Sequence, residues 1–107
     1  MPRHHTRGFI SVLHRADHFQ NHGARLGIET EEEYETFADE FLRHPCPASA
    51  RQFVRSKNRD LVRYDEAADV FAVLKKDGFI KTCYRPDPLY HGFPTNLDYY
   101  LNEAEKE

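Results

Sequence analysis

The chain has 107 residues, of which 39% are hydrophobic and 31% charged, and this composition fits one small globular domain and excludes wholesale disorder. Its formal net charge of -3 and sequence pI near 6.1 exclude an overall basic field that would attract nucleic acid. The charges are segregated, however: residues 29–40 are acidic, whereas residues 51–63 are rich in arginine, so a local basic face remains open.

A first amphipathic helix is predicted over residues 9–22, and Gly23 can end it. Its apolar positions approximate one stripe: Phe9, Leu13, Ala16 and Phe19. On the same helix His14, His18 and His22 recur every four residues, so they should share one face.

A second helix is predicted after Thr30, because Thr30 and Glu33 match the S/T-x-x-E capping pattern, in which each side chain satisfies a backbone amide at the other residue. Its apolar residues follow at the spacing of a buried stripe: Tyr34, Phe37, Ala38 and Phe41. The acidic outer face is most simply a solvated surface.

Strand patterns take over after HPCPAS at residues 44–49, whose prolines end the helix. Four strand-like segments follow, at residues 51–56, 61–65, 69–74 and 79–84. Because the links are short, with Asp77-Gly78 the clearest turn, they predict hairpins and hence an antiparallel meander. The sequence therefore predicts an α+β domain over residues 1–107, in which N-terminal helices pack on a four-stranded antiparallel sheet.

The last segment begins with RPDPLYHGFP at residues 85–94, whose prolines exclude an interior strand. Thr95 and Asp98 form another capping pair, which predicts a short C-terminal helix. We expect residues 1–8 to be flexible and residues 103–107 to fray.

Neither cysteine indicates a site, because Cys46 and Cys83 make no disulfide framework and match no zinc spacing. The sequence has no apolar run near the ~20 residues that a membrane span requires, and its first residues lack the apolar core of a signal peptide. We expect a cytoplasmic protein without a membrane partner.

Two blocks of the sequence resemble one family. Residues 60–99 read DLVRYDEAADVFAVLKKDGFIKTCYRPDPLYHGFPTNLDY, with Tyr100 next, and residues 18–42 read HFQNHGARLGIETEEEYETFADEFL. They resemble, in the expected order, bacterial ribonuclease toxin domains of the barnase, EndoU, colicin and RelE (BECR) type, which carry HF..HG…G..T.EEYE.LAD.FL and close with RYDP…FGV…DG.I.TYFKPDP..HG..TNLDYF.

The resemblance implies that a helix histidine faces the sheet and acts as an acid or base, a role that falls to His18 with His22 second. Histidine suits proton transfer because its ordinary pKa of about 6.5 lies close to working pH. Two other interpretations stay open: a two-histidine metal pair, which lacks a further ligand at a fitting spacing, or one surface histidine and one packing histidine.

On the last strand the resemblance favours Thr82, together with Tyr84, as catalytic residues. Alternation along a strand places Ile80, Thr82 and Tyr84 on one face and Lys81 and Cys83 on the other. Lys81 then steers the substrate backbone or is a plain surface lysine, and Thr82 can also be an ordinary strand residue.

Arginines are candidates for phosphate binding because the guanidinium fork matches phosphate oxygens. Arg63 ranks first, as a catalytic residue, because it lies in the RYD match. Arg51 and Arg85 are predicted substrate contacts, Arg85 standing where the family more often has lysine, and each can also be a plain surface residue.

His91 and Asn96 complete the predicted substrate-binding set. His91 with Gly92 should help to set the loop, and Asn96 can cap the helix or bind a base edge.

The resemblance implies a metal-independent endoribonuclease toxin or effector without a cofactor, acting in the cytoplasm of the producing or a target bacterium. Attack of the RNA 2′-hydroxyl on the adjacent phosphate would leave a 2′,3′-cyclic phosphate, and tRNA is the natural substrate for relatives of this size. An immunity or antitoxin protein covering the cleft is the implied partner. The alternative is a catalytically inactive protein-binding module of the same fold, which docks through its acidic helix.

Overall fold

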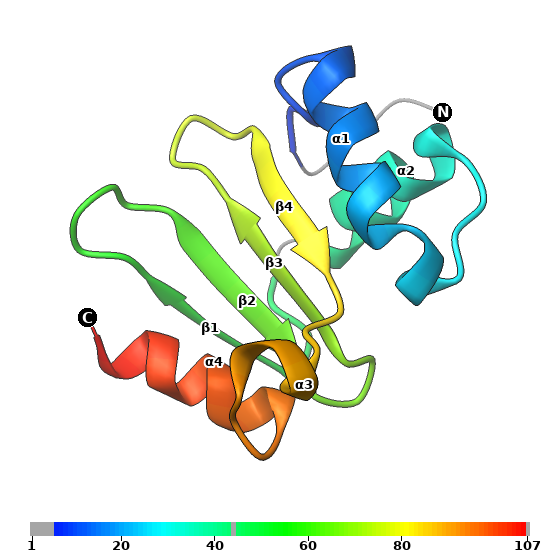
Figure 1. The fold of residues 1–107 in the computed structure, drawn as a ribbon. Helices are drawn as coiled ribbons and strands as arrows, with labels where there is room; N and C mark the ends of the chain where they lie inside the picture. The colour runs from blue at the N-terminus through cyan, green and yellow to red at the C-terminus, as the bar shows by residue number, and fades with distance from the viewer. Residues whose placement is uncertain (1–5, 44, 107) are drawn as a thin grey trace.

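A computed structural model describes residues 6–43 and 45–106 of the chain. Helices α1 (Val12–His22) and α2 (Glu31–Phe41) come first, joined through a short 3-10 turn at Ala24–Leu26. Four strands follow within the described residues: β1 (Ala50–Val54), β2 (Leu61–Asp65), β3 (Val70–Leu74) and β4 (Ile80–Tyr84). The chain ends with α3 (Pro88–His91) and α4 (Asn96–Glu105) (Figure 1). The predicted α+β class is confirmed.

The strands form one antiparallel meander in the order β1-β2-β3-β4, as predicted. The β3–β4 hairpin closes at Gly78, whose φ of 95° lies in the left-handed region that glycine adopts readily. None of the described helices is both long and apolar enough to cross a membrane.

Two cores lie on opposite faces of the sheet. The helix-side core joins the N-terminal segment and α2 to the sheet: Phe9, Tyr34, Ala38, Phe41, Leu42, Val70, Ala72, Ile80 and Cys83. The second core is covered by α4: Val62, Tyr64, Phe71, Val73 and Tyr100. The N-terminal helices therefore pack on the sheet as predicted, and the C-terminal helix covers its other face.

The predicted alternation along β4 is wrong at one point, because a β-bulge interrupts the register with β3. Leu74 pairs with Ile80 but Val73 pairs with Thr82, which leaves Lys81 as the extra residue. Ile80 therefore turns into the helix-side core beside Cys83 instead of sharing a face with Tyr84.

The helix ends follow the predicted caps. The hydroxyl of Thr30 accepts a hydrogen bond from the Glu33 amide at 3.1 Å, and that of Thr95 accepts one from the Asp98 amide at 3.0 Å. α1 begins at Val12, later than predicted, because Ser11 caps it. Gly23 ends it with ordinary helical φ, and glycine is favoured there because a Cβ would meet the Phe19 ring at 2.6 Å.

The outer edge of β4 is closed by the N-terminal segment and α1. The Arg7 amide donates to the Gly78 carbonyl at 2.7 Å, and the Ile80 amide donates to the Gly8 carbonyl at 2.8 Å. One turn into α1, the His14 ring binds the Lys81 carbonyl at 3.0 Å. α1 therefore runs alongside β4 (Figure 1).

Residues 1–8 and 103–107, which we expected to be flexible or frayed, are only partly described by the structure. Residues 1–5 and 107 lie outside the described residues. Thr6 binds the Asp39 carboxylate through its amide and its hydroxyl, at 2.9 and 2.5 Å. α4 continues to Glu105.

Arg63 ties the sheet to the end of α2. Its side chain is almost fully buried (1% exposed), and it donates to the carbonyls of Phe41 and Arg43 at 3.0 and 2.6 Å and to Gln52 Oε1 at 2.7 Å. The last carbonyls of a helix have no partner within the helix, so this guanidinium satisfies groups that would otherwise be unpaired.

Arg63→Ala should lower the free energy of unfolding by about 3 kcal/mol, because it leaves buried carbonyls without a donor. Urea denaturation measures this loss. Arg51→Ala is the matched control, since Arg51 lies exposed on the neighbouring strand and should change stability by less than about 0.5 kcal/mol. Equal effects of the two substitutions would contradict this role of Arg63.

Candidate active site

Three histidines of α1 form a continuous row against β4. The ring centroids of His14 and His18 are 4.5 Å apart, and those of His18 and His22 are 5.6 Å apart. The prediction that these side chains share one face is confirmed.

His18 meets Thr82 across the gap between α1 and β4. Its Nδ1 lies 3.0 Å from Thr82 Oγ1, a hydrogen bond whose direction depends on the imidazole tautomer. Burial lowers the pKa of His18 to about 4, and the neighbouring His14 and His22 add to this effect. His18 is therefore neutral at pH 7 and able to accept a proton.

Next along the row, His22 meets Tyr84. Their rings stack with centroids 5.0 Å apart, and the Tyr84 and Tyr99 hydroxyl oxygens are 3.1 Å apart. Burial lowers the pKa of His22, whereas burial, together with the Tyr99 hydrogen bond, raises the pKa of Tyr84 well above its usual value. At pH 7 the Tyr84 hydroxyl keeps its proton and can donate a hydrogen bond.

A cavity of about 480 Å³ opens beside His22 and Tyr84. It is lined by His22, Tyr84, Arg85, Pro86, Asp87, Tyr90, His91 and Tyr99. We call it the aromatic cavity, because most of these side chains carry rings. The His91 ring lies nearly parallel to that of Tyr99, at 4.5 Å and 9°.

The loop that carries α3 is held in place by Asn96. Its amide nitrogen donates to Asp69 Oδ1 and to the Pro86 carbonyl, both at 2.8 Å, and its amide oxygen lies 2.9 Å from His91 Nε2. The buried Asn96 side chain thus positions His91, while Thr95 caps α4.

Arg85 also holds this loop in place. Its guanidinium donates to the carbonyls of Arg25, Asp69 and Ala68, at 2.9, 3.1 and 3.2 Å. Arg25 in turn donates to the carbonyls of Arg85 and Pro86. The two arginines therefore cross-link the end of β4 to the segment after α1, at the rim of the aromatic cavity.

Four predicted catalytic residues lie together in two contacting pairs, His18 with Thr82 and His22 with Tyr84. The fifth, Arg63, pairs with Ala72 in the register, on the helix-side face, and is buried under the end of α2. Thr82 instead pairs with Val73, whose side chain belongs to the opposite core. The structure does not bring Arg63 to the His18 group.

The predicted substrate-binding residues also divide into those that lie at the aromatic cavity and those that lie elsewhere. His91 and Arg85 line the aromatic cavity, and Asn96 is hydrogen-bonded to His91 and Pro86 in its wall. Arg51 lies on β1, at the other edge of the sheet from β4. Lys81 lies at the bulge and pairs with Asp60 at 3.5 Å.

Three contributors were missed in the sequence: Arg25, Tyr90 and Tyr99. Tyr99 lies in the NLDYY motif, in the first turn of the predicted C-terminal helix, and that motif is the signal that could have found it. Arg25 has no sequence signal, because its hydrogen bonds are to backbone carbonyls some 60 residues away.

Within residues 6–43 and 45–106, no group of three or more His, Cys, Asp or Glu side chains is arranged to hold a metal ion. His18 and His22 are therefore not joined there by a third ligand. Across the gap to β4, His18 is hydrogen-bonded to Thr82, and the His22 ring stacks on Tyr84.

Comparison of the chain with protein-family models and with curated proteins gives no match. Function is therefore inferred from the site itself and from the motifs of the two sequence blocks.

His18 should make the fold sensitive to acid. Its folded pKa of about 4 lies below the unfolded value of about 6.5, so between these values the unfolded chain binds more protons. The stability that neutral His18 contributes is complete above pH 6.5 and is lost as the pH falls toward 4.

His18→Asn removes this titration and leaves an amide near the Nδ1 position. From pH 7 to pH 4.5, the free energy of unfolding of the wild type should fall more steeply than that of His18→Asn, as measured by urea denaturation at each pH. Parallel pH profiles would contradict a depressed pKa of His18.

Proposed function

We propose that this chain is a metal-independent endoribonuclease domain of the bacterial toxin type, which cuts RNA by attack of its 2′-hydroxyl on the adjacent phosphate. The observation that carries the proposal is the contact of the partly buried His18 with the Thr82 hydroxyl, 3.0 Å away, one helical turn from the aromatic cavity. The motifs of residues 18–42 and 60–99 support the same activity.

The reaction needs a base, hydrogen-bond donors for the phosphorane and a proton for the leaving group. In the tautomer that serves it, His18 Nδ1–H donates to Thr82 Oγ1, so the Nε2 lone pair accepts the 2′-hydroxyl proton. The Thr82 hydroxyl hydrogen is then directed at a phosphoryl oxygen. The new bond joins the 2′-oxygen to phosphorus as the bond from phosphorus to the 5′-oxygen breaks, and the His18 imidazolium returns the proton to the 5′-oxygen.

The aromatic cavity provides the binding site for a base. Unpaired bases in RNA are recognised by stacking on aromatic side chains, each stack contributing about 1–3 kcal/mol. Tyr90 is 93% exposed at the rim, and the Tyr84 hydroxyl keeps its proton as a donor to the substrate. The substrate is therefore a single-stranded segment of RNA, such as a tRNA loop.

Such a toxin requires a neutralising partner in the cell that makes it. The proposed partner is an immunity or antitoxin protein that covers the aromatic cavity and the His18–Thr82 pair. The inactive binding module is the competing function, and the acidic exposed residues of α2 favour it: Glu32, Glu33 and Glu40.

Purified protein should cut total RNA in the presence of EDTA and leave 2′,3′-cyclic phosphate ends. His18→Ala should lower kcat/KM by roughly 10²–10⁴-fold, the usual contribution of a general base, and Thr82→Ala should also lower it. Arg51→Ala, at the other edge of the sheet, should retain activity within a few-fold.

Equal cleavage by wild type, His18→Ala and Thr82→Ala would refute this site. Absence of cleavage by all of them, with the fold intact by circular dichroism, would favour the binding module.

The pH dependence of cleavage tests the protonation state of His18. Because the neutral ring is the base and its pKa is about 4, kcat/KM should fall on the acid side with an apparent pKa of about 4. An acid limb near 6.5 would show that His18 is not held neutral by its surroundings.

A further inference from the structure

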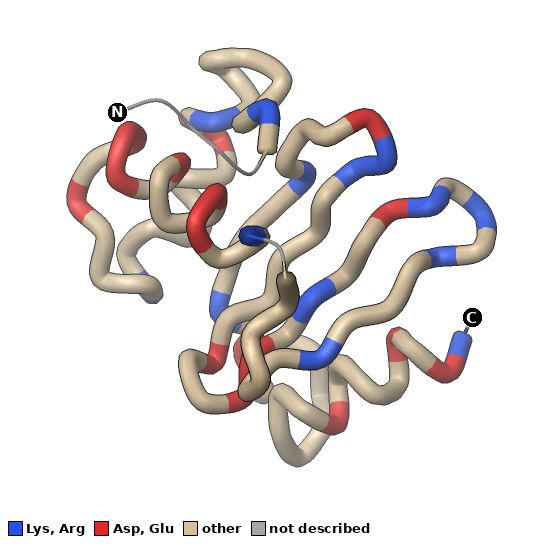
Figure 2. The backbone as a smooth tube through the Cα atoms, turned by 180° about the vertical axis from the view of Figure 1, so that it is seen from behind, with Lys and Arg blue, Asp and Glu red and all other residues tan. Residues whose placement is uncertain are grey.

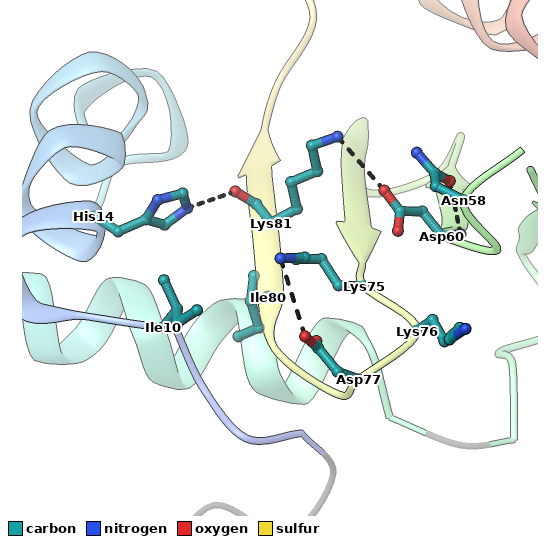
Figure 3. Close-up of a pocket in the computed structure, with 9 residues that line it drawn as sticks. All are labelled: Ile10, His14, Asn58, Asp60, Lys75, Lys76, Asp77, Ile80 and Lys81. Atoms are coloured by element: carbon teal, nitrogen blue, oxygen red, sulfur yellow. Dashed lines mark hydrogen bonds and ion pairs between the residues drawn. The ribbon is translucent and has the colours of Figure 1, made fainter.

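A second hollow lies on the other side of His18 from the aromatic cavity. Its volume is about 420 Å³, and we call it the lysine hollow (Figure 3). The polar and charged groups that matter here are His14, Asp60, Lys75, Lys76, Asp77 and Lys81. They come from α1, from the approach to β2 and from the β3–β4 hairpin.

The charges of the lysine hollow leave an excess of positive charge. Three ammonium groups face two carboxylates, and the pairs are loose: Lys81 Nζ lies 3.5 Å from Asp60 Oδ2, and Lys75 Nζ lies 4.0 Å from Asp77 Oδ2. The Lys75 and Asp77 side chains are 41% and 49% exposed, and such an exposed ion pair is weak, so an incoming anion can compete for Lys75. Lys81 is 52% exposed but stays with its buried partner Asp60, whose side chain is 6% exposed, and adds positive charge beside the anion.

The wider charge distribution also favours an anion at this end of the molecule. Figure 2 shows several basic residues on both hairpin turns, β1–β2 and β3–β4, at the same end of the sheet, with an acidic residue beside them at each hairpin, while other acidic residues lie on the helices and at the opposite end of the sheet. Although the overall formal charge is -3, these two hairpin turns carry more basic than acidic residues.

The histidine row connects the two hollows. His14 lines the lysine hollow and His22 lines the aromatic cavity, with His18 between them. Eight residues of helix separate His14 from His22, about 12 Å at about 1.5 Å per residue. A strand with about 3.4 Å per stacked nucleotide spans this distance in roughly three to four nucleotides.

We propose that the lysine hollow binds a phosphate of a nucleotide that flanks the cleaved bond, so that single-stranded RNA lies along the outer edge of β4 from the lysine hollow, past His18, to the aromatic cavity. This inference rests on the proposed function, since it takes the His18–Thr82 pair as the point of cleavage. It predicts that short substrates miss contacts that longer ones make.

The test uses a fluorescent single-stranded RNA of eight nucleotides with 2′-O-methyl groups, which cannot be cut, and a dinucleotide of the same chemistry. Binding is followed by anisotropy for the wild type and for Lys75→Gln/Lys76→Gln, which leaves the Lys81–Asp60 pair in place. The double variant should bind the octamer about tenfold more weakly. Its slope of log K against log salt should be shallower by about 0.7 for each lysine that contacts phosphate.

Two controls separate the hollow from a general charge effect. Dinucleotide binding should be unchanged in the double variant, and Lys106→Gln, whose side chain is 60% exposed at the end of α4, should leave octamer binding unchanged. Equal weakening by Lys106→Gln, equal weakening for the dinucleotide, or unchanged octamer binding by Lys75→Gln/Lys76→Gln would overturn the proposal.

The outcome is distinct from that of the cleavage assay. Lysine-dependent octamer binding without cleavage of unmodified RNA would support phosphate binding in the lysine hollow and reject cleavage at the His18–Thr82 pair. Cleavage of long RNA with equal kcat/KM by wild type and Lys75→Gln/Lys76→Gln would support the nuclease and overturn the subsite.

Discussion

Closure of the outer edge of β4 is the constraint on which the candidate site depends. An open strand edge presents unpaired amides and carbonyls, and proteins cover or interrupt such edges to prevent pairing with other chains. Here Arg7 and Gly8 pair with the start of the strand, and the His14 ring takes the Lys81 carbonyl. Because a helix completes the closure, most of the β4 edge is covered by α1 side chains. Among the described residues, no fifth strand pairs along it.

The same closure sets the chemistry of the histidine row. Rings spaced one turn apart along α1 are pressed against Thr82 and Tyr84, which removes water from them and brings them close to one another. Both effects disfavour the charged imidazole, so His18 stays neutral at pH 7. A histidine on a solvated helix face would keep a pKa close to its ordinary value.

The bulge at Lys81 links the edge to the two hollows. The extra residue lets Ile80 enter the helix-side core while Thr82 and Tyr84 stay on the other face, within reach of α1. It also projects Lys81 toward Asp60 in the lysine hollow. At the other end of the strand, Arg25 and Arg85 lock the loop that completes the aromatic cavity. One irregular strand thus organises both binding surfaces proposed for RNA.

Local patterns in the sequence determined the class of fold, the meander order, the caps at Thr30 and Thr95 and the shared face of the histidines, because each depends on neighbours within a few residues along the chain. The motifs also selected His18, His22, Thr82 and Tyr84, which the fold brings into contact. Tertiary structure alone decided the burial of Arg63 under α2 and the role of Arg25, since these depend on backbone groups about 20 to 60 residues away. It also decided the bulge, which lies within the β3–β4 hairpin but turns Ile80 into a core shared with the N-terminal segment and α2. An arginine in a sequence shows its charge but not whether its guanidinium meets phosphate or the carbonyls of its own chain, and only packing settles that choice.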